Sequence, residues 1–91
     1  MNYRRNENVI LRSIAGETLL VPVCGNLVDL QNIYVLEGIG EFLWNLVDDR
    51  SLDLLRDAVT ARFEIDAEQA GRDVREFIDD LAARGLITGT P

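Results

Sequence analysis

Histidine and lysine are both absent from the 91 residues, so all nine positive charges belong to arginines. Without histidine, the chain lacks the commonest general base and the commonest metal ligand. A nucleophilic serine or cysteine would therefore lack its usual partner. The single cysteine, Cys24, cannot form an intrachain disulfide or a cysteine-rich metal site. Its place beside an apolar segment predicts a small, half-buried hydrophobic residue. We expect a protein that is not an enzyme and holds no metal and no cofactor.

The sequence also lacks a long apolar run. No window reaches the length of a membrane span, and the polar start Met1–Arg5 is unlike a signal peptide. These features predict a cytoplasmic protein. Sixteen acidic residues outweigh the nine arginines, giving a net charge of −7. Such a surface repels a nucleic-acid backbone and anionic lipid, so we expect no nucleic-acid partner and no membrane partner. A basic peptide, or a basic groove on another protein, is favoured.

Hydrophobic residues make up 47% of the chain, enough for one compact core. We expect a flexible N-terminus over residues 1–8, one folded domain over 9–87 and a C-terminal tail over 88–91. A domain of this size is only marginally stabilised by its own core, which makes a homodimer compatible with the sequence but not required.

The first half of the chain has strand composition. Residues 9–14 and 18–23 are rich in β-branched residues and leucine, and Ala15-Gly16-Glu17 between them predicts a hairpin turn. Pro22 suits an edge or a strand end better than a central position in a sheet. Residues 24–32 predict a long connection, in which a helical turn is compatible with the pattern. Residues 33–36 predict a third strand.

The second half has helical periodicity. The pattern predicts helices over residues 39–47, 52–63 and 67–84, with Ser51 and Asp66 as N-caps and Gly85 as the left-handed cap after the last helix. Segregated strands and helices indicate an α+β domain. The specific prediction is a winged helix-turn-helix: a three-stranded antiparallel β-sheet followed by three α-helices.

Several motifs could suggest chemistry. Asp48-Asp49 and Asp79-Asp80 are paired carboxylates, but adjacent helical residues point about 100° apart, so we interpret both pairs as solvated charge. Gly38 and Gly40 precede a helix without the third glycine and lysine of a phosphate loop, and we interpret them as a tight turn. The last predicted helix is net negative, which is the wrong sign for DNA recognition.

Two segments resemble the pyrroloquinoline quinone biosynthesis protein D family (PqqD-like). They are YVLEGIGEFLWNLVDDRS, from Tyr34 to Ser51, and DVREFIDDLAARGLI, from Asp73 to Ile87. The resemblance spans roughly residues 9 to 87. It departs from the family at Glu37, where members often have asparagine, and in the long connection over residues 24–32.

The resemblance implies a recognition element for a ribosomally made precursor peptide. In such domains, the leader segment of the peptide adds a strand to the free edge of the third strand, in a groove beside the last helix. A partner enzyme, often a radical S-adenosylmethionine protein, then modifies the held peptide. An unpaired strand edge permits this role physically. The predicted peptide-binding residues lie on the third strand and on one flank of the last helix: Ile33, Tyr34, Val35, Leu36, Asp73, Glu76, Phe77 and Asp80.

Alternatives remain at this stage. On the last helix, the opposite flank with Gly71, Arg75, Ile78 and Ala82 could line the groove instead. The carboxylates of the first flank would favour Lys or Arg in the leader, and Phe77 would pack a leucine or an aromatic residue. A winged-helix regulator that acts through protein contacts or DNA is the second hypothesis. A small cofactor or quinone enzyme is the third, and it would need a deep pocket with titratable residues.

Overall fold

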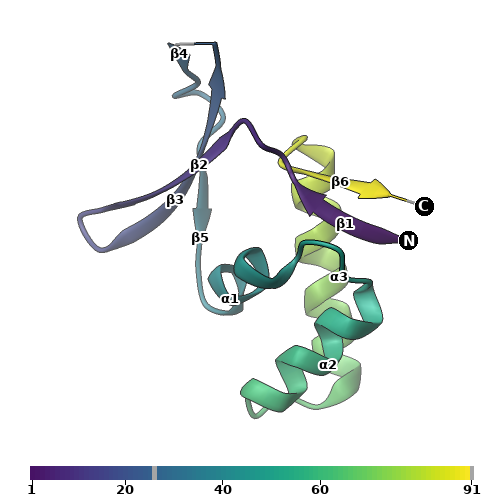
Figure 1. Ribbon diagram of the computed structural model, residues 1–91. Coiled ribbons are helices and arrows are strands. Elements are labelled where there is room, and N and C mark those ends of the chain that lie inside the picture. Colours follow the sequence, from purple (N-terminus) through teal and green to yellow (C-terminus); the bar gives the residue numbers. More distant parts are fainter. Residues whose placement is uncertain (26, 91) are drawn as a thin grey trace.

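The computed structural model describes residues 1–25 and 27–90, and it confirms the α+β class (Figure 1). In this part of the chain, strands occupy most of the first half, helices most of the second, and a last strand follows. The elements are β1 Asn2–Arg5, β2 Val9–Ile14, β3 Glu17–Cys24, β4 Leu27–Val28, β5 Tyr34–Leu36, α1 Ile39–Leu46, α2 Leu52–Arg62, α3 Ala67–Ala83 and β6 Ile87–Thr90. The expectation of one three-stranded sheet was wrong: the described residues form a four-stranded sheet and a two-stranded sheet, and the two-stranded sheet consists of the terminal strands β1 and β6.

The predicted hairpin is confirmed. β2 and β3 pair antiparallel from Val9↔Pro22 to Ile14↔Glu17, and the turn places Ala15 and Gly16 at φ of 52° and 82°. Positive φ at both central positions is the geometry of a two-residue hairpin turn. β5 pairs with the other side of β3, from Thr18↔Leu36 to Leu20↔Tyr34. β3 is thus the middle strand, with β2 along one side and β5 along part of the other.

Pro22 lies inside the middle strand and not at a strand end as expected. The hydrogen bond from Val23 N to Asn8 O shows that Pro22 belongs to the residues whose backbone nitrogen points away from β2. On that side β5 has already ended, because its last pair with β3 is Leu20↔Tyr34. The chain that follows β4 lies on that side, where Asp29 N donates to Pro22 O at 2.8 Å, so the proline forgoes only the reciprocal N–H bond at the end of the β3–β4 pairing.

The connection after β3 contains a short strand where the sequence suggested a helical turn. β4 folds back on β3 through the pairs Val23↔Val28 and Cys24↔Leu27. Asp29 then organises the turn into β5: its carboxylate accepts from Gln31 N at 3.1 Å and from Asn32 Nδ2 at 2.7 Å. Asn26, which we included in this connection, lies outside the described residues.

The termini form a second sheet, which corrects the expectation of a flexible N-terminus and a tail. β1 pairs antiparallel with β6, from Asn2↔Thr90 to Arg5↔Ile87. Pairing between two segments that lie so far apart in the sequence leaves no local signal, so the polar composition of residues 1–8 misled the prediction. Pro91, in the predicted tail, lies outside the described residues.

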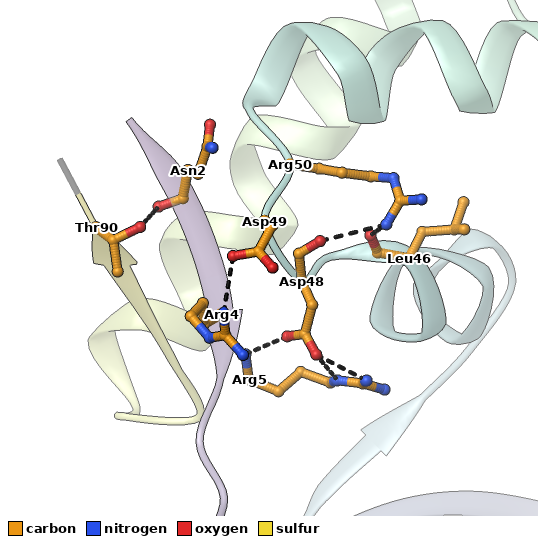
Figure 2. A network of polar contacts seen from close by, with 8 residues as sticks. All are labelled: Asn2, Arg4, Arg5, Leu46, Asp48, Asp49, Arg50 and Thr90. Carbon is orange, nitrogen blue, oxygen red and sulfur yellow. Dashed lines mark hydrogen bonds and ion pairs between the residues drawn. The ribbon is translucent and has the colours of Figure 1, made fainter.

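Ion pairs hold β1 against the turn after α1 (Figure 2). Asp48 accepts hydrogen bonds from Arg5 N at 2.8 Å and from Arg5 Nη2 at 2.9 Å, and Arg4 pairs with Asp49 at 2.9 Å. The Arg5 guanidinium also lies 5.7 Å from the Trp44 ring centroid. Hydrogen bonds from Arg5 hold the pKa of Asp48 below its ordinary value. The pair Asp48-Asp49 is therefore structural, where we had expected only solvated charge.

The helix signals are confirmed. Ser51 Oγ accepts from Leu54 N at 3.3 Å, and the Asp66 carboxylate accepts from Gln69 N at 2.8 Å, so both predicted N-caps form. Gly85 ends α3 at φ 74°. The apolar stripes of the helices meet the inner face of the sheet. The fully buried core side chains come from every layer: Leu20, Leu43, Leu55, Val59, Val74, Ile78, Leu81 and Ile87.

The β2–β3 hairpin and β4 extend away from α2 and α3, whereas β5 leads directly into α1 (Figure 1). The molecule is correspondingly elongated and thin, with extents of 41 × 34 × 16 Å. Within residues 1–25 and 27–90, none of the helices combines the length and the apolar character that a bilayer crossing requires. This layout leaves both the free edge of β5 and the face of the sheet that lies away from the helices uncovered.

Candidate functional site: a groove between β5 and α3

β5 offers an unpaired strand edge. Its pairs with β3 place the backbone groups of Tyr34 and Leu36 toward β3, because the proline geometry above assigns the even-numbered residues of β3 to that side. By the alternation of an antiparallel ladder, the N–H and C=O of Val35 point to the open edge. In the described part of the chain, β5 has only β3 as a partner. The edge can therefore accept a further strand.

A groove of about 380 Å³ lies beside this edge. β5 and the start of α1 form one side, and one flank of α3 forms the other. The lining residues are Tyr34, Val35, Glu37, Ile39, Gly40, Asp73, Glu76, Phe77 and Asp80. We name this feature the β5–α3 groove. It is made from the first flank of the last helix, the one that we had favoured from the sequence.

Six of the eight predicted residues thus converge on the groove, and two do not. Leu36 is 5% exposed and belongs to the hydrophobic core, because the strand pleat turns it toward the helices. Ile33 precedes β5 and lines a different hollow, on the face of the sheet that lies away from the helices. On α3, Ile78 of the rejected flank is fully buried in the core.

The floor of the groove is aromatic. The Phe77 and Tyr34 rings meet edge to face, with centroids 6.4 Å apart. Gly40 permits the Phe77 ring to lie close to α1: a Cβ at this position would lie 3.1 Å from Phe77 Cε1. We had interpreted Gly38 and Gly40 together as a tight turn. Only Gly38, at φ 56°, has that role, whereas Gly40 is buried in the first turn of α1.

Four carboxylates surround this floor, from Glu37, Asp73, Glu76 and Asp80. Asp80 is paired with Arg84 at 3.0 Å, and Asp73 accepts a hydrogen bond from Gln69 Nε2 at 2.7 Å. Within the described residues, the other two carboxylates form no ion pair. The rim is therefore strongly negative, with only one arginine to offset it.

The titratable groups of the rim influence one another. Hydrogen bonding from Arg84 holds the pKa of Asp80 below its ordinary value, against an opposing effect of burial, and Tyr34 adds a smaller lowering effect. Partial burial, followed by the bond to Asp80, raises the pKa of Tyr34. The Arg84 guanidinium also lies 5.0 Å from the Tyr34 ring centroid. Tyr34 thus stays a neutral phenol at ordinary pH, fixed in place by Asp80 and Arg84.

Sequence reasoning missed Glu37, Ile39 and Gly40. Glu37 did have a signal, because it departs from the asparagine that is frequent in the resembled family. The other two follow the strand, and no periodicity indicates that the start of α1 faces α3. Cys24 also differs from the prediction: it is exposed at the end of β3. Within residues 1–25 and 27–90, no group of three or more acidic or cysteine side chains is arranged so that it could hold a metal ion.

A hairpin wing beside three helices defines a winged-helix domain, and comparison with known proteins assigns the family. The model of Coenzyme PQQ synthesis protein D (PqqD) matches residues 24–87, so the chain belongs to the PqqD family. No curated protein matches the chain.

One solved structure with this fold is TbiB1 in complex with the TbiA(beta) leader peptide. Its TM-score is 0.73 and its identity is 23%, and the match covers 100% of this chain and 99% of that one. The likeness confirms the predicted winged-helix fold.

Proposed function

We propose that this domain is a non-catalytic adaptor that binds the leader segment of a ribosomally made precursor peptide and presents it to a modifying enzyme. The observation that supports this best is the open edge of β5 beside the β5–α3 groove. Membership of the PqqD family agrees with it. So does the likeness to TbiB1, which was solved with a leader peptide bound.

The leader would bind as an added strand. A peptide strand lies 4.7–4.9 Å from its neighbour and exchanges main-chain hydrogen bonds with it. Here those bonds would form with Val35, whose N–H and C=O point to the open edge. Every second side chain of the peptide would then point into the groove, over the rings of Tyr34 and Phe77. Main-chain bonds supply register, and the groove supplies selectivity.

The lining of the groove specifies the chemistry of the leader. An apolar residue, leucine or aromatic, would fill the space over Phe77 and Ile39. Lys or Arg beside it would meet Glu37, Asp73 and Glu76. An acidic leader would be repelled by the same carboxylates and by the net charge of −7. We therefore infer that the ligand is a basic segment with an apolar anchor.

The presented peptide would be modified by a separate enzyme, and a radical S-adenosylmethionine protein is the class that the family resemblance suggests. The domain itself would contribute position and not chemistry. This division agrees with a site that consists of carboxylates, aromatic rings and backbone groups without a histidine. Ribosomal synthesis of the peptide makes the cytoplasm the setting that we propose.

A titration of labelled backbone amides with a synthetic candidate leader, followed by nuclear magnetic resonance, tests this function. We expect shifts concentrated on residues 33–37 and on the Asp73, Glu76 and Phe77 flank of α3. The amide of Val35 should become protected from solvent exchange. A scrambled peptide of the same composition is the control. If the candidate leaders produce no shifts and the domain binds DNA at low salt, the adaptor function is wrong and a regulator is favoured.

A further inference from the structure

The face of the sheet that lies away from the helices is apolar and uncovered. The register places Ile10 opposite Val21, and Leu19 opposite Val35, so these four side chains share one face. Leu20, between Leu19 and Val21, points to the core instead. Together with the segment after β4, this face forms a hollow of about 380 Å³. We name it the outer hollow, and its lining residues are Ile10, Arg12, Ser13, Ile14, Leu19, Val21, Val28, Leu30 and Ile33.

Large apolar side chains are strongly exposed at the two ends of this face. Ile14 is 58% exposed and Leu30 is 73% exposed. The molecule exposes 6031 Å², whereas a compact monomer of 10.2 kDa exposes about 5,300 Å². This excess of roughly 700 Å² belongs to the whole thin molecule, and it is of the same size as the area of about 800 Å² that each partner buries in a standard interface.

Charge distinguishes this face from the rest of the surface. Residues 9–36 include only three charged side chains, Arg12, Glu17 and Asp29, so six of the seven net negative charges lie elsewhere. Two copies that approach through their helices would meet strong like-charge repulsion. Through the outer face they would meet little.

The face is also self-complementary. Arg12 lines the hollow, and Glu17 lies opposite Ile14 on the same face, so each copy presents both signs around an apolar centre. A two-fold axis brings one patch against the identical patch of the partner, and this arrangement allows a cation of each copy to face an anion of the other. Sheets that pack face to face lie about 10 Å apart and bury such side chains.

We propose that this face binds a second copy of the chain, forming a symmetric dimer through the outer hollow. The β5–α3 groove lies toward the helices, so it stays open in the dimer. The two copies would then present two peptide grooves. This inference does not depend on peptide binding, because the residues that line the outer hollow differ from those of the groove; Val35 alone touches both, with its side chain on the outer face and its backbone at the open edge.

Sedimentation velocity of the full chain without peptide, over about 5 to 500 μM, tests the dimer. We expect the mean mass to rise from 10.2 kDa toward twice that value. Ile10→Glu should weaken the dimer by about tenfold or more, because it buries an unpaired charge. Leu11→Glu is the matched control. Both residues are 40% exposed, but Leu11 lies on the opposite face, in a hollow beside Trp44.

Three outcomes would overturn the proposal. A monomer at every concentration would mean that the outer hollow does not bind a second copy, and it would favour a different protein as the partner of this face. A dimer that resists Ile10→Glu would lie elsewhere on the surface, and so would a dimer that Leu11→Glu weakens equally. Ile14→Glu, at the exposed end of the hairpin, provides a second variant with little risk to the fold. Both outer-face variants should bind the leader peptide with unchanged affinity, which separates failure of the dimer from failure of the peptide function.

Discussion

At the scale of single residues, the groove combines rings that are fixed in position with carboxylates that are not neutralised. Tyr34 meets Phe77 edge to face, and the Arg84 guanidinium lies 5.0 Å from the Tyr34 ring centroid. Glu76 has no ion-pair partner within the described residues. A carboxylate without an ion-pair partner in the described part of the chain is available to a ligand. Its effect should therefore appear in binding and hardly at all in stability.

Glu76→Gln tests this role against Asp79→Asn. Both substitutions remove one negative charge from α3, but only Glu76 lines the groove. We expect Glu76→Gln to weaken a lysine-containing leader about two- to fivefold, as measured by isothermal titration calorimetry, with a smaller loss at 0.5 M salt. Asp79→Asn should change the affinity by less than about 1.5-fold. Equal losses for the two variants would show that the net charge of the domain matters and that the rim does not.

Asp48 illustrates a residue whose charge supports the fold. The hydrogen bonds from Arg5 hold its pKa below the value near 3.9 expected in the unfolded chain. A carboxyl group with a lowered folded pKa adds stability above the unfolded value, and this stability is lost as the pH falls through the folded value. Since Asp48 joins β1 to the turn after α1, this pH dependence belongs to the terminal sheet.

We expect Asp48→Asn to lower the free energy of unfolding by about 1 kcal/mol at pH 7, measured by urea denaturation. The difference from the unmodified chain should shrink as the pH falls below about 4, because the unfolded chain then takes up a proton at Asp48 first, and it should vanish once the pH lies below the lowered folded pKa, where Asp48 is protonated in both states. Asp49→Asn is the control. Its pair with Arg4 is more exposed and asparagine also tolerates its φ of 62°, so a change within about 0.5 kcal/mol is expected. A constant difference for Asp48→Asn down to pH 2 would contradict the prediction.

At the scale of elements, β5 has two roles on its two sides. It completes the sheet by pairing with β3, and it leaves Val35 as the outward-facing residue of the edge. A three-residue strand provides few main-chain hydrogen bonds, so each one matters to a peptide that adds to it. The backbone groups that hold β5 in the sheet are therefore different from those at its open edge. A single substitution can remove a group at the edge and leave the bonds to β3 in place.

Val35→Pro removes the outward N–H and leaves the bonds to β3 intact. Proline is tolerated at an edge position whose N–H faces solvent. We expect circular dichroism and the unfolding midpoint to change little, while leader binding falls by about tenfold or more. Val35→Thr keeps the N–H and the branched shape, and it should bind almost normally. Full binding by the proline variant would mean that the peptide does not add to this edge.

At the scale of the whole molecule, a net charge of −7 acts on any charged ligand before contact. The acidic residues are concentrated in the helical half, where the groove lies. An acidic domain attracts a basic peptide over distances comparable to the Debye length, which is about 10 Å at 0.1 M salt. The attraction should therefore appear in the rate of association.

We expect the association rate of a basic leader, measured by stopped-flow fluorescence, to fall about tenfold between 20 and 500 mM salt. The dissociation rate should change less, because it depends on the aromatic contacts and the strand bonds. A peptide with its lysines and arginines replaced by glutamine is the control, and its association rate should hardly respond to salt. A strong salt effect on the control would point to a cause other than steering.

The sequence alone determined the features that have a local physical cause. The hairpin, the two N-caps, the left-handed Gly85 and the apolar stripes of the helices all depend on residues within a few positions of one another, and all were predicted correctly. The flank of α3 with Asp73, Glu76 and Phe77 was favoured from the sequence over the opposite flank, although helical periodicity left both open, and its contact with a peptide stays a prediction. The absence of histidine shaped the functional hypothesis before any fold was known.

Only the tertiary structure decided which segments meet. The pairing of β1 with β6, the turn of Leu36 into the core and the place of Gly40 against Phe77 depend on contacts between distant parts of the chain. The same holds for the groove, which needs β5, the start of α1 and α3 together. Local propensity cannot specify such contacts, because their free energy comes from burial and pairing that exist only after the elements have packed.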